Sequence, residues 1–154
     1  MEVKQLLENV RILVIDDEKD IRGTLKDILE GAGYIVDTAK SGAEALEKAS
    51  KYFYNLALVD IKLPDLDGTT LLTKMKETTP KMVKIIVTGY PDMQNAIEAI
   101  NKGADGYLVK PFSPDELLKI VKEHLEKQQE EKKYSLRKVE EFIETRAREI
   151  NAEL

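Results

Sequence analysis

The stretch Val10-Arg11-Ile12-Leu13-Val14-Ile15-Asp16-Asp17-Glu18 decides the fold of this chain. A short, mostly apolar run rich in β-branched residues ends abruptly at three carboxylates. A run of this length is too short for a helix and is typical of a β-strand that is buried on both faces. We therefore expect a parallel sheet whose first strand delivers acidic side chains to one edge.

Four similar runs follow, and segments with apolar residues at helical spacing separate them. The short runs cover residues 34–36, 56–59, 83–87 and 107–109, and the helical segments cover residues 21–29, 43–49, 71–75, 93–100 and 117–125. Five strand–helix units in this order predict an α/β fold: a doubly wound, five-stranded parallel sheet with helices on both faces and right-handed crossovers.

The end of the chain predicts a long helix. Residues 115–154 contain neither Gly nor Pro, so they could form one helix of roughly 60 Å, part of which must project from a domain of this size. We expect a lead-in over residues 1–8, a domain over residues 9–127 and a charged helical extension over residues 128–154.

The predicted extension carries an apolar stripe at steps of three and four residues. It consists of Leu136, Val139, Ile143, Ala147, Ile150 and Leu154. Two interpretations stay open: a solvated helix whose stripe folds back on the domain, or a helix that pairs with a partner or with a second copy. The pattern favours pairing, although it is shorter than the three or four heptads of a secure coiled coil.

Composition excludes several classes of protein. The 154 residues include no Cys, so there is no disulfide scaffold, thiolate metal site or cysteine nucleophile. The net charge of −5 argues against a protein that coats nucleic acid. No apolar run has the length of a signal peptide or a membrane span, so we expect a cytoplasmic protein with no membrane contact.

Functional side chains gather at the predicted carboxyl ends of the strands, where ligands bind in open α/β sheets. The first strand ends at Asp16-Asp17-Glu18, the third at Asp60, the fourth at Thr88-Gly89 and the fifth at Lys110-Pro111. Two carboxylates about 4 Å apart repel each other by roughly 4 kcal/mol at an effective dielectric near 20. A magnesium ion, which prefers oxygen ligands, relieves that repulsion.

The same side chains suit phosphoryl transfer. Lys110 supplies a positive charge and Thr88 a hydroxyl donor for phosphoryl oxygens. An aspartate beside a metal can be the nucleophile and form an aspartyl phosphate. Asp60 is the best candidate, because it stands alone at a strand end while Asp16 and Asp17 can form the metal's side.

Four blocks of this sequence resemble the receiver domains of two-component response regulators, in particular chemotaxis-regulator-like ones. They are LVIDDE at 13–18, LVDIKLPDLDG at 58–68, IVTGY at 86–90 and GADGYLVKPF at 103–112, in the family's order and spacing. The likeness covers about residues 9 to 127. It implies a flavodoxin-like sheet with strand order 2-1-3-4-5.

The resemblance also implies residue roles. Asp60 would accept a phosphoryl group from a phosphohistidine on a sensor histidine kinase or phosphotransfer protein. Asp17, Asp60 and the backbone carbonyl of Lys62 would ligate Mg²⁺, and Asp16 would hold a metal-bound water. Thr88 and Lys110 would contact the phosphoryl oxygens.

Further roles follow from the same resemblance. Tyr107 would swing inward when the Thr88 hydroxyl moves to the phosphate, remodelling the face formed by the fourth helix, the fifth strand and the fifth helix. The Lys110–Pro111 bond is expected to be cis. Lys62 and Tyr90 would flank the path of the attacking water and modulate the lifetime of the phosphate.

We therefore expect a signalling module that catalyses only its own phosphorylation and dephosphorylation. The roughly thirty residues after the domain are too few for an ordinary DNA-binding domain. The expected output is contact with a downstream protein. A homodimer through the C-terminal helix, or through the face of the fourth helix, fifth strand and fifth helix, is also expected.

Two rival functions stay open. The first is a haloacid-dehalogenase-type phosphatase with Asp16 as nucleophile, in which Glu18 stands where that family has Asp. The lack of a later acidic pair and of a cap domain argues against it. The second is a constitutive adaptor that never uses its pocket, which the complete set of acidic, Thr and Lys positions disfavours.

Overall fold

The computed structural model describes residues 10–75, 77–78 and 81–153. Five parallel strands form one sheet in the order β2-β1-β3-β4-β5. They are β1 (Arg11–Ile15), β2 (Ile35–Ala39), β3 (Leu56–Asp60), β4 (Val83–Thr88) and β5 (Gly106–Val109). The predicted doubly wound sheet and its strand order are confirmed. The predicted lead-in over residues 1–8, and Leu154, lie outside the described residues.

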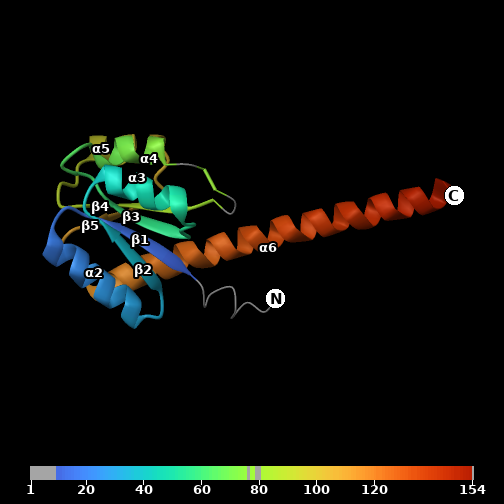
Figure 1. Ribbon diagram of the computed structural model, residues 1–154, viewed down its shortest axis with the longest axis horizontal. Helices are drawn as coiled ribbons and strands as arrows, with labels where there is room; N and C mark the ends of the chain where they lie inside the picture. The colour runs from blue at the N-terminus through green and yellow to red at the C-terminus, as the bar shows by residue number, and fades with distance from the viewer. Residues whose placement is uncertain (1–9, 76, 79–80, 154) are drawn as a thin grey trace.

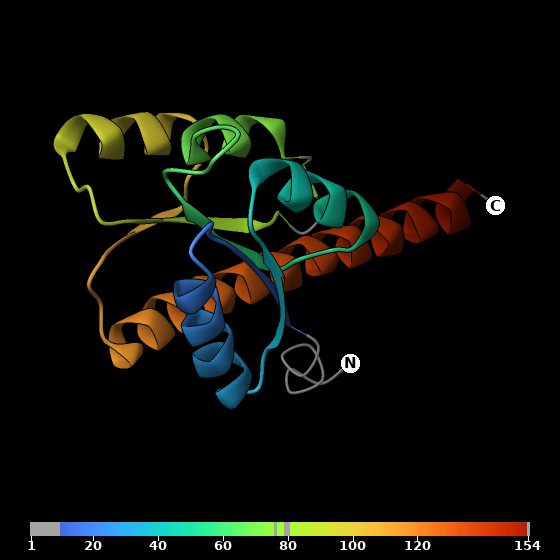
Figure 2. The same cartoon turned by 60° about the vertical axis from the view of Figure 1, so that its left-hand side comes forward.

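Helices cover both faces of the sheet. They are α2 (Lys19–Gly31), α3 (Gly42–Lys51), α4 (Gly68–Lys74), α5 (Met93–Asn101) and α6 (Pro114–Glu153). Helices α3, α4 and α5 lie on one side of the sheet, and α2 and the first part of α6 lie on the other (Figures 1 and 2).

Side chains that alternate between the two faces of the sheet divide the core into two layers. Ile12 and Val14 of β1 pack with Leu25 of α2 and Val121 of α6, whereas Leu13 of β1 faces the layer under α3, α4 and α5. Successive side chains of a strand point to opposite faces. Continuous apolar runs such as the one in β1 are therefore required by a sheet that is covered on both sides.

One strand is longer than its apolar run predicts. The pattern predicted residues 34–36, but β2 extends to Ala39 through Asp37 and Thr38. β2 is an edge strand that pairs only with β1, and its outer side tolerates polar side chains. Tyr54 donates a hydrogen bond to Asp37 at 2.6 Å. A search for apolar runs does not detect the polar half of an edge strand.

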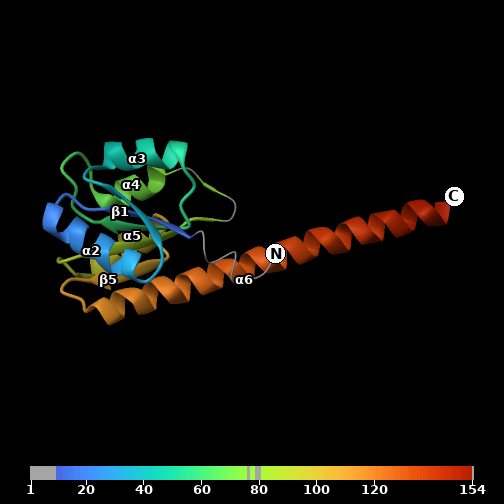
Figure 3. The same ribbon diagram turned by 60° about the horizontal axis from the view of Figure 1, so that its bottom comes forward.

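Helix α6 runs without a break across the predicted boundary between residues 127 and 128. Leu117, Val121 and Leu125 are buried against the sheet, whereas every described residue from position 134 onward is exposed. The helix projects far beyond the domain (Figures 1 and 3), as its length predicted. None of the helices in the described part of the chain has the length and apolar character that crossing a membrane requires.

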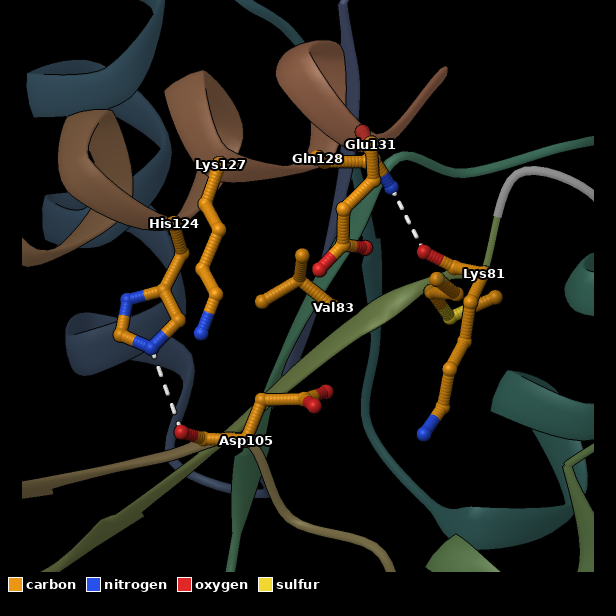
Figure 4. Close-up of a pocket in the computed structure, with 8 residues that line it drawn as sticks. Lys81, Val83, Asp105, His124, Lys127, Gln128 and Glu131 are labelled. Atoms are coloured by element: carbon orange, nitrogen blue, oxygen red, sulfur yellow. Dashed lines mark hydrogen bonds between the residues drawn. The ribbon is translucent and has the colours of Figure 1, made fainter. Parts of the chain in front are cut away.

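Two polar side chains fix α6 at the amino-terminal edge of the sheet (Figure 4). Gln128 donates to the carbonyl oxygens of Asn55 at 2.9 Å and Lys81 at 2.8 Å. The His124 ring nitrogens lie 2.9 Å from the Ile120 carbonyl oxygen and 3.2 Å from that of Asp105. These contacts anchor the helix just before it leaves the domain.

At Gly68 the chain passes very close to the backbone of Asp60, near the carboxyl edge of the sheet. Its N–H donates to the Ile61 carbonyl at 2.8 Å, and a Cβ at this position would collide with the carbonyl oxygen of Asp60. We expect Gly68→Ala to lower the free energy of unfolding by about 1–3 kcal/mol, the usual cost of overpacking.

Gly23→Ala is the matched control. Nothing lies within 4 Å of a Cβ at this exposed position of α2, so removal of glycine's entropy cost should raise stability by about 0.5–1 kcal/mol. Denaturant unfolding measures both effects. A Gly68→Ala protein as stable as the wild type would show that this approach is not a packing constraint.

Candidate functional site

Three carboxylates meet beyond the strand ends. Asp16 and Asp17 follow β1, and Asp60 is the last residue of β3. One oxygen from each lies within 4.8 Å of the others. Asp16 and Asp60 are buried and Asp17 is exposed. Because β1 and β3 are parallel neighbours, the fold itself brings these like charges together.

Lys110 supplies the opposing charge from the end of β5. Its Nζ lies 3.0 Å from Asp16 Oδ2 and 3.8 Å from Asp60 Oδ2. Burial alone would lower the pKa of Lys110, but the hydrogen bond to Asp16 and the charges of Asp16 and Asp60 outweigh it and raise the pKa. The ammonium is therefore held charged. The Lys110–Pro111 bond is cis, as expected.

Asp60 is the carboxylate of the cluster whose ionised form is disfavoured. Burial, followed by the charge of Asp16, raises its pKa from 3.8 to about 6, although Lys110 and the Lys62 N–H act in the opposite direction. One ammonium thus leaves part of the negative charge at this edge uncompensated. Three carboxylates with one exposed member form a donor set that fits a hard divalent cation.

Thr88 and Tyr107 share one face of the sheet. Tyr107 lies opposite Ile86 in the β4–β5 register, two residues before Thr88. The Thr88 side chain is fully buried, and its Oγ1 accepts a hydrogen bond from the Tyr90 N–H at 2.9 Å. The hydroxyl of Tyr107 is buried without a hydrogen-bond partner among the described residues. An unsatisfied buried hydroxyl is costly, whereas the rest of Tyr107 packs against the buried core.

Lys62 and Tyr90, which are predicted to modulate the lifetime of the phosphate, contact each other. The Nζ of Lys62 lies 3.7 Å from the centre of the Tyr90 ring, a distance at which a cation is attracted to an aromatic face. Lys62 is two residues after Asp60, and its N–H donates to Asp60 Oδ1 at 3.3 Å. Tyr90 follows Thr88 at the same spacing. The pair therefore links the loops after β3 and β4.

Several supporting contacts could not be found from sequence patterns. The Arg22 guanidinium donates to the Asp16 carbonyl at 2.8 Å. Asp65 accepts from the Gly42 and Ala43 N–H groups at 2.9 and 2.8 Å, which ties the loop after β3 to the start of α3. Arg22 and Asp65 belong to residue types that are common on surfaces, so only the folded arrangement reveals their partners.

The fold brings most of the predicted site residues together at the carboxyl edge of the sheet. Asp16, Asp17, Asp60 and Lys110 form one cluster, and Asp60 pairs in register with Val87, the residue before Thr88. The predicted metal-binding role of the Lys62 carbonyl stays a prediction. The exposed Glu18, the position on which the phosphatase alternative depends, is the N-cap residue of α2 but forms no side-chain cap.

Comparison with known proteins agrees with this geometry. Residues 12–122 match the model of the response regulator receiver domain. A receiver domain protein (CheY-like) from Methanospirillum hungatei JF-1 has a similar structure, with a TM-score of 0.76 and 46% identity, over 80% of this chain and 98% of the other.

Longer regulators are similar over the same region. The chain is 37% identical to the DNA-binding transcriptional regulator NtrC of Escherichia coli K12 over 78% of its own length and 26% of NtrC. It is 35% identical to the C4-dicarboxylate transport transcriptional regulatory protein DctD of Rhizobium meliloti over 75% and 25%, respectively. The chain thus spans about a quarter of the length of these curated relatives.

Burial of Asp60 and the charge imbalance at this edge should together have a measurable effect on stability. The folded-state pKa of Asp60 is raised, so the stabilisation from its protonated form is present below about pH 4 and is lost as the pH rises through about 6. In chelator at pH 7, Asp60→Asn should therefore raise the free energy of unfolding by about 1–3 kcal/mol, because one pKa unit corresponds to about 1.4 kcal/mol.

Asp27→Asn, on the exposed side of α2, is the control and should change stability by less than about 0.5 kcal/mol. Urea unfolding at pH 5 and pH 7 measures both variants. A destabilised Asp60→Asn protein at pH 7 would contradict the proposed repulsion.

Proposed function

The chain belongs to the response regulator receiver domain family, and from this premise we propose that it accepts a phosphoryl group on Asp60 in a Mg²⁺-dependent reaction. Phosphorylation would then switch a protein-interaction surface. The observation that carries this proposal is the cluster itself: three carboxylates within 4.8 Å, bordered by an ammonium 3.8 Å from Asp60.

Contacts of the two buried carboxylates favour Asp60 over Asp16 as nucleophile. Both oxygens of Asp16 are engaged, Oδ1 by the Glu18 N–H at 2.9 Å and Oδ2 by Lys110 at 3.0 Å. Among the described residues, the contacts of Asp60 are longer, 3.3 Å to the Lys62 N–H and 3.8 Å to Lys110. An oxygen of Asp60 is therefore more available for attack. This difference argues against the haloacid-dehalogenase-type phosphatase.

The proposed physiological donor is a phosphohistidine on a sensor histidine kinase or phosphotransfer protein. A carboxylate oxygen of Asp60 attacks phosphorus, the N–P bond breaks, and its electron pair returns to the donor imidazole. Lys110 offsets the charge on the phosphoryl oxygens, and the Thr88 hydroxyl can donate to one of them. The product is an aspartyl phosphate.

The donor set around Asp60 fits Mg²⁺. Asp16, Asp17 and Asp60 would hold the ion, and the carbonyl of Lys62 is a further proposed ligand. When bound, Mg²⁺ supplies positive charge that offsets both the carboxylates and the phosphoryl oxygens. The exposed position of Asp17 leaves that side of the cluster open to an arriving ion.

A hollow beside Lys110 suits the approach of the donor protein. This cavity of about 450 Å³ is lined mainly by α2 and the segment after β5, including Ile21, Thr24, Pro111 and Phe112. Lys110 lines the hollow and also contacts Asp16 and Asp60. A donor that fills the hollow with apolar side chains would bring its phosphohistidine next to the acceptor.

The switch proposal depends on Thr88 and Tyr107. If the Thr88 hydroxyl turns toward the phosphoryl group, the space beside it on the same face of the sheet opens for Tyr107. The unpartnered hydroxyl of Tyr107 supports such a movement, because no hydrogen bond to the described residues would have to break. The surface that would change carries the exposed apolar side chains of Met93, Ile97 and Val109, which suit contact with a downstream protein or a second copy.

The cellular setting follows from the same function. A cytoplasmic location matches a chain that receives phosphoryl groups from sensor kinases. The predicted absence of a DNA-binding output stays a prediction, because NtrC is a DNA-binding regulator of which this chain spans only 26%.

We expect acetyl phosphate with Mg²⁺ to add one phosphoryl group per wild-type chain, measured by intact mass, because the oxygens of Asp60 are held less closely than those of Asp16. Asp60→Asn should abolish the addition and Asp27→Asn should retain it. Uptake by the Asp60→Asn protein, or repeated turnover of varied phosphate esters, would overturn the proposal.

The Lys62–Tyr90 contact should prolong the life of the phosphate. A paired ammonium and ring on the loops that follow Asp60 and Thr88 would limit the access of the attacking water, so Tyr90→Ala should accelerate phosphate release severalfold. Tyr134→Ala, an exposed aromatic in α6, is the control. The measurement is decay of the phosphorylated mass after removal of acetyl phosphate, and equal decay rates in wild type and Tyr90→Ala would rule out shielding.

A further inference from the structure

The projecting half of α6 carries an apolar stripe that nothing among the described residues covers. Leu136, Val139, Ile143 and Ile150 are 51–60% exposed, and Ala147 is exposed between them. Most of the stability of a helix in a protein comes from packing of its apolar face. A projecting helix with an uncovered stripe therefore lacks its main source of stability.

The stripe continues the face by which α6 packs on its own domain. Val121 and Leu125 are buried against the sheet, and Val139 and Ile143 follow them after about five helical turns. Residues separated by whole turns lie on the same side of a helix. The stripe therefore faces the side on which the domain lies. The part of α6 that carries it lies beyond the domain's edge (Figures 1 and 3).

Within residues 136–150 the stripe is symmetric about Ile143. Val139 and Ala147 lie four residues before and after Ile143, and Leu136 and Ile150 lie seven residues before and after it. Reversing the helix direction thus superimposes the pattern on itself, which is the self-complementarity that a two-fold interface requires. We propose that a second copy of the chain covers the stripe, with the two α6 helices antiparallel and centred on Ile143.

The position of the domain selects the antiparallel direction. Packed helices lie about 8–10 Å apart. In a parallel pair, the partner's segment around Leu125 would lie on the same side of α6 as the sheet and would collide with it. In an antiparallel pair the two domains lie at opposite ends of the helices, and neither obstructs the other.

Charges beside the stripe fit this arrangement on one flank and oppose it on the other. With about 100° per residue, Glu153 comes opposite the partner's Lys132, which is favourable. On the other flank, Glu140 and Glu144 of both copies approach the two-fold axis, where their like charges weaken the contact. Replacing both by Gln should therefore strengthen the dimer.

The experiment uses the full chain, which contains no Cys, so each introduced thiol is unique. Under mild oxidation, Ile143→Cys should form a disulfide-linked dimer. Leu136→Cys should not link to itself but should link to Ile150→Cys when the two proteins are mixed. Tyr134→Cys, on the opposite side of the helix, is the control and should give only background linkage. Self-linkage of Leu136→Cys, as a parallel pair requires, would overturn the antiparallel arrangement.

Sedimentation equilibrium over a concentration series tests association without a cross-link. The wild type should dimerise, Ile143→Lys should weaken the dimer by roughly tenfold or more because it buries a charge, and Tyr134→Lys should leave it unchanged. The variant with both Glu140→Gln and Glu144→Gln should associate more tightly. Circular dichroism verifies that each variant keeps its helix content.

A monomeric wild type at all concentrations, or equal losses in the Ile143→Lys and Tyr134→Lys proteins, would disprove the proposal. Asp60→Asn should dimerise like the wild type, because the stripe lies outside the acceptor cluster. Sedimentation therefore tests helix pairing, and intact mass after acetyl phosphate tests phosphorylation, so the failure of one proposal can be told from the failure of the other.

Discussion

Repulsion between carboxylates that a parallel sheet forces together is the constraint on which the rest of this structure depends. Neighbouring parallel strands end at the same edge, so Asp16 after β1 and Asp60 at the end of β3 have no way to separate. One ammonium, that of Lys110, relieves part of the repulsion. Burial of Asp60, followed by the remaining repulsion from Asp16, raises the pKa of Asp60 to about 6. An edge with this excess of negative charge suits a divalent cation, so the same feature that costs stability fits the proposed metal site.

The surrounding structure maintains this arrangement and links it to more distant surfaces. The absence of a Cβ at Gly68 lets the chain return close to the Asp60 carbonyl, while Arg22 and the Lys62–Tyr90 contact connect the loops around the cluster. Thr88 and Tyr107 lie on one face of the adjacent strands β4 and β5, and in the proposed switch they would link Asp60 to the surface of α5 and β5. Helix α6 is fixed at the opposite edge by Gln128 and His124 and then leaves the domain. Phosphorylation and self-association would thus use separate parts of one molecule.

Much of the fold and most of the candidate site were predictable, because both follow from short patterns in the sequence. Apolar runs located four of the strands closely, and in a parallel sheet their ends necessarily share an edge, so Asp16, Asp60 and Lys110 could be grouped in advance. The polar half of β2 was missed, since an edge strand does not require apolar residues such as those of β1. The contacts of Arg22, Asp65 and Gln128 could not be predicted either. Each contact depends on the position that a flexible polar side chain takes in the folded chain, and no local sequence pattern predicts such a contact.

Chemical identification of the acceptor residue tests the central claim most directly. Borohydride reduces an acyl phosphate to an alcohol, which would convert a phosphorylated aspartate to homoserine. After treatment with acetyl phosphate and Mg²⁺, reduction and peptide mass spectrometry should find homoserine at position 60 and aspartate at positions 16 and 17. Homoserine at position 16, or no conversion in a protein that has taken up phosphate, would contradict the account.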